Sequence, residues 1–525
     1  MQILIVLLCA KLVYIQIVAG PAFAEAAARQ QMVSLVGADR RAFIYDRNMM
    51  PLTGLNREYV YIIKKDGVPE QSVKDILEKL DAAPVSGAGK EYYVYAGSTY
   101  KKQYADLLVN RYNAYIFECD RRYSDSQTAA HIIGYINPYD NTGVSGIEEE
   151  LNDLLSSAER RTYVYADRAG QILAGAGSVL RGTEAVQDIV LTIDMRMQEA
   201  LEEILAQADK NCAAVIVDCG SGEILAMAST PVYNPNNVAA YIESEKAELL
   251  NKVTQGEYPP GSIFKLVVAA AALEKGVIDM DSTFYCTGSE KLGDIEIGCS
   301  TGGEDGHGEI NLKDAFAYSC NSAFIQIGKR VGAEDITEMA TAMGLGEVPL
   351  QDIPNSKRGH VTENKDAQGA GIGNLSIGQG TMLVTPLQVA RLTSIIANSG
   401  NDIELSLIKN SDDIAAVSAE FAGSYKKRTV RSNVISEETA RKLRYLMELT
   451  AQYGTASGGN AGLSFAGKTG SAEDGETVHG WFTGFTPAEE PRYTITVFAE
   501  EGKSGRASAV PIFNKIAEAL TRIDQ

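Results

Sequence analysis

Strand-like segments at both ends of the second half of the chain, separated by a long helical stretch, most constrain its fold. The run AAVIVDCGSGEILAMAS, residues 213–229, has two apolar stretches around a glycine-containing turn, which is typical of a β-hairpin. Near the C-terminus LSFAGKTG, HGWFTGF and RYTITVFAEE are three further strand-like runs, and the helical run PIFNKIAEALTRI follows them. Helical patterns dominate residues 262–451. We therefore predict one sheet built from both ends of a domain, with a helical lobe inserted between them.

The preceding part of the chain, residues 30–182, has a mixed pattern. It contains the short β-like runs RAFIYDR, REYVYIIKK and KEYYVYAG and one amphipathic helical run, SVKDILEKLDAA. This pattern predicts a separate α+β domain. A break follows at about residue 182, after which DIVLTID reads as a strand and Asp194 as the N-cap of a helix.

The N-terminal residues 1–19 are nearly all apolar and long enough to span a bilayer, although Lys11 is unfavourable there. We expect a membrane anchor. A secretory signal is the alternative, since AFA at residues 22–24 resembles a cleavage site, but the basic segment that begins such signals is missing. A buried amphipathic helix is the third interpretation. Either of the first two exports the rest of the chain.

The charge of the chain argues against nucleic acid as a partner. Its 68 acidic and 48 basic side chains give a net charge of -20, and no Lys/Arg-rich block offsets it. Such a surface repels a phosphate backbone.

Cysteine and histidine positions predict neither a zinc site nor a dense disulfide framework. The seven cysteines are odd in number and contain no C-x-x-C, and the four histidines are dispersed (Cys9, Cys119, Cys212, Cys219, Cys286, Cys299, Cys320; His131, His307, His360, His479). Cys286 and Cys299 are close enough in sequence for a hairpin disulfide, but we favour the unpaired state. We expect no metal and no cofactor.

Ser262 and Lys265 in YPPGSIFKL are the first candidate for a reaction centre. Residues three apart share a helix face, and a serine in the first turn lies where unpaired N–H groups favour a developing anion. The apolar neighbours of Lys265 should desolvate it, lower its pKa and allow it to act as a base. However, Ser-x-x-Lys recurs at Ser98, Ser406 and Ser424. On this pair alone, a capping serine and a lysine that extends to solvent are the favoured interpretation.

Two further motifs follow in order and change that assessment. Ser319-Cys320-Asn321 is a Ser-x-Asn within a predicted helix-loop-helix, and Lys468-Thr469-Gly470 ends a strand-like run. Each is weak alone, because Ser399-Gly400-Asn401 and Lys503-Ser504-Gly505 imitate them. In sequence, however, Ser-x-x-Lys, Ser-x-Asn and Lys-Thr-Gly are the combined signature of β-lactamases and penicillin-binding proteins.

With these motifs the chain resembles a class B, monofunctional penicillin-binding protein, a peptidoglycan D,D-transpeptidase, over nearly its whole length. RRAFIYDRN resembles the segment after the membrane anchor of that family, with Ala42 in place of the usual glycine. GVSGIEEELNDLL resembles a pedestal motif. LTIDMRMQ, GEILAMASTPVYNPN, SIGQGTMLVTPLQVA and HGWFTGFTP resemble successive blocks of the transpeptidase domain.

The resemblance implies an α+β fold: the penicillin-binding transpeptidase fold, with an antiparallel five-stranded sheet flanked by helices and a helical lobe. It implies a membrane anchor over residues 1–20, a pedestal (dimerisation-like) domain over 21–182 and a transpeptidase domain over 183–525. The expected location is the bacterial cell membrane, with a single span and an extracytoplasmic catalytic domain.

The resemblance also assigns roles to residues. Ser262 attacks the D-Ala-D-Ala carbonyl of a peptidoglycan stem peptide, and Lys265 takes its proton. Ser319 relays a proton toward the departing D-alanine, Asn321 orients Lys265 and the substrate amide, and Lys468 supports the relay.

The strand motif is implied to bind substrate. Thr469, Gly470 and Ser471 line the substrate, with the hydroxyls of Thr469 and Ser471 holding its terminal carboxylate. The family usually has threonine at the position of Ser471, and serine keeps the hydroxyl. Backbone N–H groups of Ser262 and Ser471 form the oxyanion hole. Cys320 is expected to be a small packing residue.

Three alternative functions remain. GLSFAGKT matches the P-loop pattern of an NTPase, but a turn and a strand are predicted after it where a P-loop requires a helix. A β-lactamase or β-lactam sensor is the second, because Glu148-x-x-Leu151-Asn152 imitates a deacylating motif; we expect Glu148 to lie instead on an exposed acidic helix face. The third is a catalytically silent scaffold.

The expected partners are stem peptides, β-lactams and a membrane polymerase of the SEDS family, since no glycosyltransferase domain fits in this chain.

Overall fold

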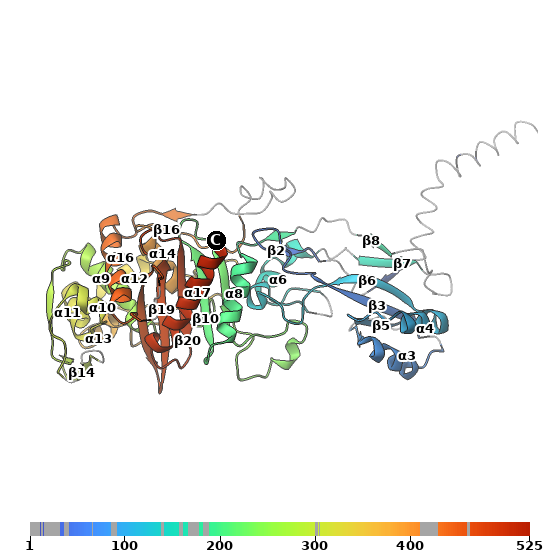
Figure 1. Cartoon of the computed structure of the whole chain (residues 1–525), viewed down its shortest axis with the longest axis horizontal. Coiled ribbons are helices and arrows are strands. Elements are labelled where there is room, and N and C mark those ends of the chain that lie inside the picture. The colour runs from blue at the N-terminus through green and yellow to red at the C-terminus, as the bar shows by residue number, and fades with distance from the viewer. Residues whose placement is uncertain are drawn as a thin grey trace, which may run out of the picture.

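The computed structural model describes most of the chain, and two regions follow one another along its long axis (Figure 1). The described residues are 11, 14, 32–35, 41–65, 67–85, 92–137, 141–156, 161–165, 178–181, 188–299, 303, 305–409, 429–458 and 462–525. The predicted membrane anchor lies outside them except for Lys11 and Tyr14. Within the described residues, no helix is both long and apolar enough to cross a membrane.

A five-stranded antiparallel sheet forms the centre of the larger region, which confirms the predicted α+β class. Its strand order is β11-β10-β20-β19-β18. The strands come from both ends of the domain: β10 (Cys212–Asp218), β11 (Ile224–Ser229), β18 (Ala466–Asp474), β19 (Thr477–Thr486) and β20 (Tyr493–Ala499). β10 and β20 pair directly, with Val215 opposite Thr496, so the hairpin and the C-terminal strands join into one sheet.

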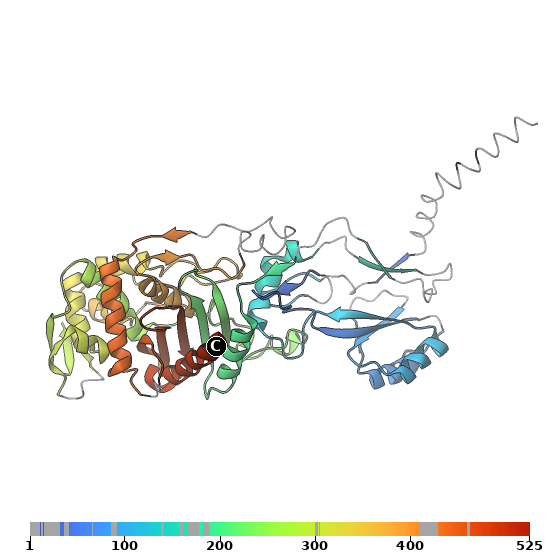
Figure 2. The same cartoon turned by 45° about the horizontal axis from the view of Figure 1, so that its top comes forward.

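Both faces of this sheet are buried, which explains why its central strands are apolar at nearly every position. Along β10, Ala213 and Val215 pack into one core and Ala214 and Ile216 into the other. Helices α8 (Met195–Ala206) and α17 (Val510–Asp524) cover one face (Figure 2). As predicted, Asp194 caps α8, because its carboxylate accepts a hydrogen bond from the Arg196 N–H.

The helical lobe covers the other face and one end of the sheet. Its central helix, α9 (Lys265–Glu274), is buried from Lys265 to Leu273. The surrounding helices are α10 (Leu312–Ala317), α11 (Asn321–Val331), α12 (Ala333–Ala342), α13 (Gly371–Ser376), α14 (Pro386–Ala397) and α16 (Glu437–Gln452). A helix that is apolar on all sides must be enclosed in this way, so α9 is a rigid support for the residues at its start.

The smaller region contains a four-stranded sheet of order β4-β5-β3-β6. Its strands are β3 (Asn56–Lys64), β4 (Ala83–Pro84), β5 (Tyr92–Gly97) and β6 (Tyr115–Arg121). Helices α3 (Glu70–Leu77) and α4 (Lys102–Tyr112) pack against it around Leu77 and Leu108. The strand-like runs REYVYIIKK and KEYYVYAG and the amphipathic helix are thereby confirmed, whereas RAFIYDR contributes only a two-residue strand outside this sheet.

One expectation in this region was wrong: Glu148, on α6 (Gly146–Glu150), is completely buried rather than exposed. Its carboxylate pairs with Arg41 and with Arg122 at 2.7 Å and accepts a hydrogen bond from the Tyr123 hydroxyl at 2.9 Å. The acidic run around Glu148 gave no sign of this, because both arginine partners are distant in sequence.

The segment that contains Arg41 also joins the two regions. β2 (Ile44–Tyr45) pairs in parallel with β9 (Ile189–Val190), and Arg47 forms an ion pair with Glu223 at 3.1 Å. The predicted strand DIVLTID is therefore short: only Ile189–Val190 form a strand, and Leu191 makes an isolated bridge to Ile408. Ala42, which stands where the resemblance implies a glycine, is buried and does not have a positive φ, so a side chain fits there.

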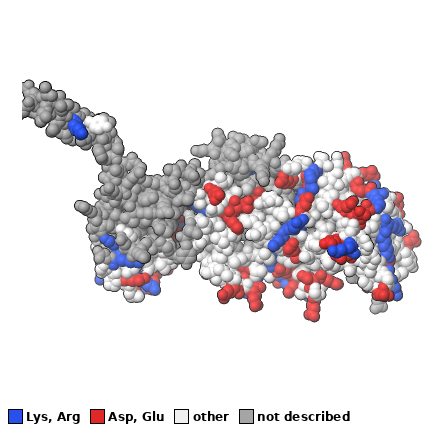
Figure 3. All heavy atoms as spheres, turned by 180° about the vertical axis from the view of Figure 1, so that it is seen from behind, with Lys and Arg blue, Asp and Glu red and all other residues white. Residues whose placement is uncertain are grey.

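Charged side chains of both signs are interspersed over the described part of the face shown in Figure 3. This distribution agrees with the strongly acidic composition of the chain.

Candidate active site

Ser262 lies at the junction between a helix and the edge strand of the large sheet. Pro-Pro-Gly leads into the short helix η4 (Gly261–Phe264), which continues directly into α9. Gly261 has φ +53, its N–H donates to Gly378 O at 2.9 Å, and a Cβ there would lie 2.4 Å from Ser471 O on β18. Only glycine allows this approach. It places Ser262 beside the strand that carries Lys-Thr-Gly.

The buried Lys265 is held by the Ser-x-Asn segment. Its Nζ lies 2.7 Å from Ser319 O, 3.1 Å from Ser319 Oγ and 2.7 Å from Asn321 Oδ1. The Asn321 amide is oriented by its own donor, because Nδ2 donates to Gly298 O at 2.9 Å, which leaves Oδ1 facing the lysine. The structure thus brings together two motifs that are more than 50 residues apart.

Ser319 occupies a left-handed turn between α10 and α11, with φ +58. A non-glycine residue in this conformation carries strain that the surrounding structure must balance. Here the carbonyl and the hydroxyl of Ser319 both face Lys265, and Lys468 Nζ donates to the same hydroxyl at 3.0 Å. The three motifs converge on this one hydroxyl.

Both lysines lie in a dry, aromatic environment that changes their charge state. Lys265 and Lys468 are fully buried and lie over the rings of Phe324 and Phe316 at 5.4 and 5.6 Å. Burial lowers the pKa of Lys265 to about 7, as the sequence predicted in direction. Burial, and then the charge of Lys265, hold the pKa of Lys468 well below its ordinary value.

A neutral Lys265 has the hydrogen-bonding capacity that a base requires. A neutral amine has two N–H donors and one lone pair. Ser319 O and Asn321 Oδ1 can only accept, so they take the two N–H groups, and the lone pair is left for a serine hydroxyl. Among the described residues, the Ser262 hydroxyl makes no hydrogen bond, to Lys265 or to any other group, and the serine hydroxyl in contact with Lys265 is that of Ser319, at 3.1 Å.

The predicted substrate-binding residues lie on β18 beside this centre. Thr469 is buried and its hydroxyl lies 2.5 Å from that of Thr455, whereas the Ser471 side chain is exposed and accepts a hydrogen bond from Gly505 N–H at 3.3 Å. A Cβ on Gly470 would meet Ile263 at 2.8 Å, so glycine is required for η4 to pack here. Sequence reasoning missed Thr455, Phe316 and Phe324, and no local motif distinguishes them.

The competing motifs do not form a site. Lys468 and Thr469 belong to a continuous strand and no helix follows them, so the P-loop interpretation has no structural basis. Ser98 lies exposed in a bend after β5, and Ser424 lies outside the described residues. Ser504 caps the short helix η6 (Gly505–Ala509), so Lys503-Ser504-Gly505 has no strand geometry.

The cysteines near the site have no disulfide partner among the described residues. The five cysteines whose side chains are described form no disulfide, including Cys286 and Cys299. Three of them meet His307 beside the Ser-x-Asn segment (Cys286, Cys299, Cys320). The sequence spacing gave no metal-ligand pattern for these residues; the fold brings them together.

The comparison with known proteins agrees with the geometry of this site. A family model described as the penicillin binding protein transpeptidase domain matches residues 212–518. The chain is 29% identical over 436 residues to the peptidoglycan D,D-transpeptidase PbpA of Mycobacterium tuberculosis, covering 76% of this chain and 84% of that protein. It is 27% identical over 430 residues to the peptidoglycan D,D-transpeptidase FtsI of Buchnera aphidicola, covering 78% of this chain and 70% of that protein.

Solved structures share the fold over almost the whole chain. Penicillin-binding protein PBP2 of Helicobacter pylori, in complex with MreC, has a TM-score of 0.72 at 24% identity and covers 94% of this chain and 98% of that one. PBP2 of Pseudomonas aeruginosa, in complex with WCK 5153, has a TM-score of 0.66 at 24% identity, with coverage of 92% and 96%.

Proposed function

Because the chain belongs to the penicillin-binding protein transpeptidase family, we propose that it is a peptidoglycan D,D-transpeptidase in which Ser262 is the acylated nucleophile. The observation that carries this proposal is a hydrogen-bonded centre on the helix that follows Ser262: Lys265 and Lys468 both contact the Ser319 hydroxyl, and Lys265 also donates to Asn321. The transpeptidases PbpA and FtsI, to which the chain is similar, support the reaction class.

In the acylation step the Ser262 oxygen attacks the carbonyl carbon of the penultimate D-alanine, and its proton passes to the lone pair of neutral Lys265. The oxyanion that forms accepts hydrogen bonds from the backbone N–H groups of Ser262 and Ser471. When the C–N bond breaks, the departing D-alanine amine needs a proton. Ser319 donates this proton to the amine. A lysine then reprotonates Ser319, and the contacts of the Ser319 hydroxyl with Lys265 and Lys468 suit this transfer.

In the second step an amine of another stem peptide attacks the ester and displaces Ser262. The attacking amine gives a proton to Ser319, which passes a proton on to Lys265, and Lys265 returns it to the serine oxygen, so the enzyme is restored. A β-lactam acylates the same serine by opening its ring, and because its leaving nitrogen stays attached, the ester persists. The buried state of Glu148, within its arginine pairs, supports the absence of a deacylating role for that carboxylate.

We place the protein at the bacterial cell membrane, with residues 1–20 as a single-pass anchor, residues 21–182 as the pedestal and residues 183–525 as the extracytoplasmic transpeptidase domain. Glycan polymerisation then falls to a partner, for which we propose a SEDS-family membrane polymerase bound through anchor and pedestal. A pull-down with full-length chain and with pedestal variants tests this partner.

The direct test of the enzyme is labelling by fluorescent penicillin, with intact mass and peptide mapping to locate the adduct. We expect one long-lived adduct on Ser262, and none in Ser262→Ala. Ser98→Ala, which alters another Ser-x-x-Lys at an exposed position, is the matched control and should label normally. No labelling of the wild type would favour a silent scaffold. Rapid complete turnover of penicillin would favour a β-lactamase.

A further inference from the structure

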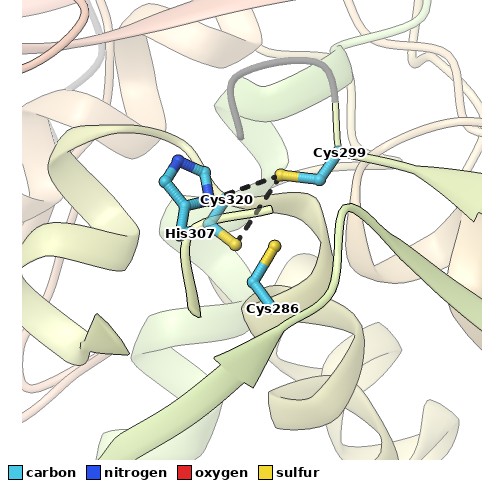
Figure 4. A group of neighbouring side chains, drawn as sticks. All are labelled: Cys286, Cys299, His307 and Cys320. Carbon is cyan, nitrogen blue, oxygen red and sulfur yellow. Dashed lines mark hydrogen bonds between the residues drawn. The ribbon is translucent and has the colours of Figure 1, made fainter. Parts of the chain in front are cut away.

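Three cysteines and one histidine that the proposed reaction does not use meet beside the Ser-x-Asn segment (Figure 4). Their ligand atoms all lie within 4.8 Å of one another. They come from separate places in the chain: Cys286 ends β12 (Thr283–Cys286), Cys299 follows β14 (Ile295–Gly298), His307 precedes β15 (Gly308–Asn311), and Cys320 caps α11. We propose that these four side chains bind one Zn²⁺ ion.

Two of the distances between ligand atoms are close to the edges of a zinc tetrahedron, and the other pairs lie within 4.8 Å. Cys299 Sγ lies 3.7 Å from Cys320 Sγ and 3.8 Å from His307 Nδ1. With Zn–S bonds of about 2.3 Å and Zn–N bonds of about 2.05 Å, tetrahedral angles put two sulfurs about 3.8 Å apart and a sulfur and a nitrogen about 3.6 Å apart. A disulfide needs its sulfurs at about 2.05 Å. The spacing therefore suits a shared ion.

The ligand types select zinc and a structural role. Three thiolates and one imidazole in tetrahedral arrangement are a common zinc set, and four protein ligands leave no position open for a reacting water. The cysteines are nearly inaccessible, with exposed fractions of 0% for Cys286, 3% for Cys299 and 0% for Cys320. Their burial keeps solvent from the ion.

Neighbouring groups orient the ligands. The N–H of Ala323 donates to Cys320 Sγ at 3.4 Å, and the ring of His307 stacks on that of Tyr318 with centroids 6.2 Å apart and planes 20° apart. Contacts of this kind, outside the ligand set, fix ligands in metal sites. The backbone contributes as well, because Gly306 has φ +72 and a Cβ there would lie 2.3 Å from Cys286 O.

The position of Cys320 gives the ion a consequence for the proposed function, on which this step rests. Cys320 lies between Ser319 and Asn321, the two residues that hold Lys265. A metal bond at Cys320 connects the left-handed turn at Ser319 to three other points of the lobe. Zinc thereby positions both neighbours without touching substrate.

The experiment measures metal in the purified full-length chain by mass spectrometry after dialysis against a weak chelator. We expect about one zinc per chain in the wild type. Cys299→Ser and His307→Ala should lose the zinc, because removing a ligand should lower zinc affinity by more than the roughly 10- to 100-fold that changes outside the ligand set typically cause. His307→Cys should retain zinc, because a set of four cysteines also binds zinc tetrahedrally. Cys219→Ser, at a buried cysteine on a different strand end, should retain it as the matched control.

Cobalt(II) supplies a second readout. The wild type and His307→Cys should show the thiolate charge-transfer and strong visible bands of tetrahedral cobalt, and His307→Ala should not. Zinc retained in both Cys299→Ser and His307→Ala, iron in place of zinc, or a metal-free chain with a Cys299–Cys320 disulfide overturns the site.

The effect of zinc on acylation can be tested separately from zinc binding. We expect His307→Ala to acylate with penicillin at least about tenfold more slowly and His307→Cys to recover the rate. If zinc is bound but acylation does not depend on it, the positioning role is wrong while the metal site stands. If wild type binds zinc but never labels with penicillin, the proposed function fails instead.

Discussion

Lys265 Nζ has three oxygen neighbours and no exposure to solvent, so the protein sets its charge. Burial is the main cause that lowers its pKa to about 7, opposed by Cys320 and Cys299. Lys468 faces it from β18. Only the neutral amine accepts the proton of Ser262, and the neutral fraction grows as pH rises through the pKa. We therefore expect the rate of acylation by penicillin to rise with pH, with a midpoint near 7, in stopped-flow measurements.

An unperturbed lysine would give a midpoint near 10.4 instead. A rate that is flat from about pH 5.5 to 8.5, while the protein stays folded by circular dichroism, would contradict the assignment of Lys265 as the base.

Replacing Lys265 by arginine tests the same role by chemistry. A guanidinium stays protonated and cannot accept the proton, so we expect Lys265→Arg to acylate about 10²- to 10⁴-fold more slowly, the usual contribution of general base catalysis. Lys275→Arg, at a partly exposed lysine at the end of the same helix, is the control and should match wild type. Equal rates for both variants in the penicillin assay would rule out Lys265.

The five residues assigned to catalysis could be predicted because each belongs to a short motif and the three motifs occur in order (Ser262, Lys265, Ser319, Asn321, Lys468). The carboxylate of Glu148 and the cluster around Cys320 could not. Their partners lie at other places in the sequence: His307 is 8 residues from Cys299, and Arg41 is 107 residues from Glu148. Local spacing contains no information about such contacts.

At the scale of elements, the packing of η4 on β18 determines whether the serine and the strand meet. A side chain at Gly261 would strike Ser471 O and would also have to adopt φ +53. Gly276, after α9, has a similar φ of +68 but open space around it. We expect Gly261→Ala to lose most penicillin labelling and Gly276→Ala to keep it, although both lose stability from backbone strain.

Thermal unfolding and labelling measured side by side separate the two effects. If Gly276→Ala loses labelling to the same extent as Gly261→Ala, strain explains the loss and the close approach of η4 to β18 does not.

The elements themselves were largely predictable, since the alternating and continuous apolar runs mark β10, β18, β19 and β20. The run DIVLTID was less predictable as a strand. Ile189, Leu191 and Ile193 are completely buried, as strand residues would be, but only Ile189–Val190 pair as a strand. An apolar run records burial, whereas a strand also requires a continuous ladder with one neighbour, and after Val190 the backbone bonds go to different segments, as from Leu191 to Tyr45 and from Thr192 to Leu407.

At the scale of the whole molecule, the Glu148 network holds the segment that joins the two regions. Glu148→Gln leaves Arg41 and Arg122 buried without their counter-charge, and breaking a buried pair in this way usually costs about 3–5 kcal/mol. We expect a clearly lower unfolding midpoint in urea. Glu118→Gln, which removes the exposed partner of Arg57, should change little and is the matched control. Equal midpoints would mean that the network contributes no net stability.

His131 adds a pH-dependent contact at the same junction. On α5 (Ala130–Ile133), its Nε2 donates to Glu248 O at 2.7 Å, and burial lowers its pKa to about 4, with Lys252 acting in the same direction. The unfolded chain, with an ordinary pKa of about 6.5, binds the proton first as pH falls. Stability should therefore fall between about pH 6.5 and 4, by up to about 3 kcal/mol from this residue.

The difference in unfolding free energy between wild type and His131→Gln isolates this contribution, because the carboxylates titrate equally in both. The wild type should lose stability relative to the variant as pH falls through that window. Parallel pH curves would show that His131 is protonated at no cost in the folded protein.

A sheet assembled from both ends of a domain has a consequence during synthesis. Ser262 and its helix are made about 200 residues before β18, and the sheet cannot be completed until β18–β20 have been added. Until then the nucleophile lacks Lys468, the oxyanion-hole strand and one wall of its pocket. With the proposed mechanism, we expect a growing or prematurely terminated chain to be unreactive toward stem peptides and β-lactams alike, and reactivity to appear only in finished molecules.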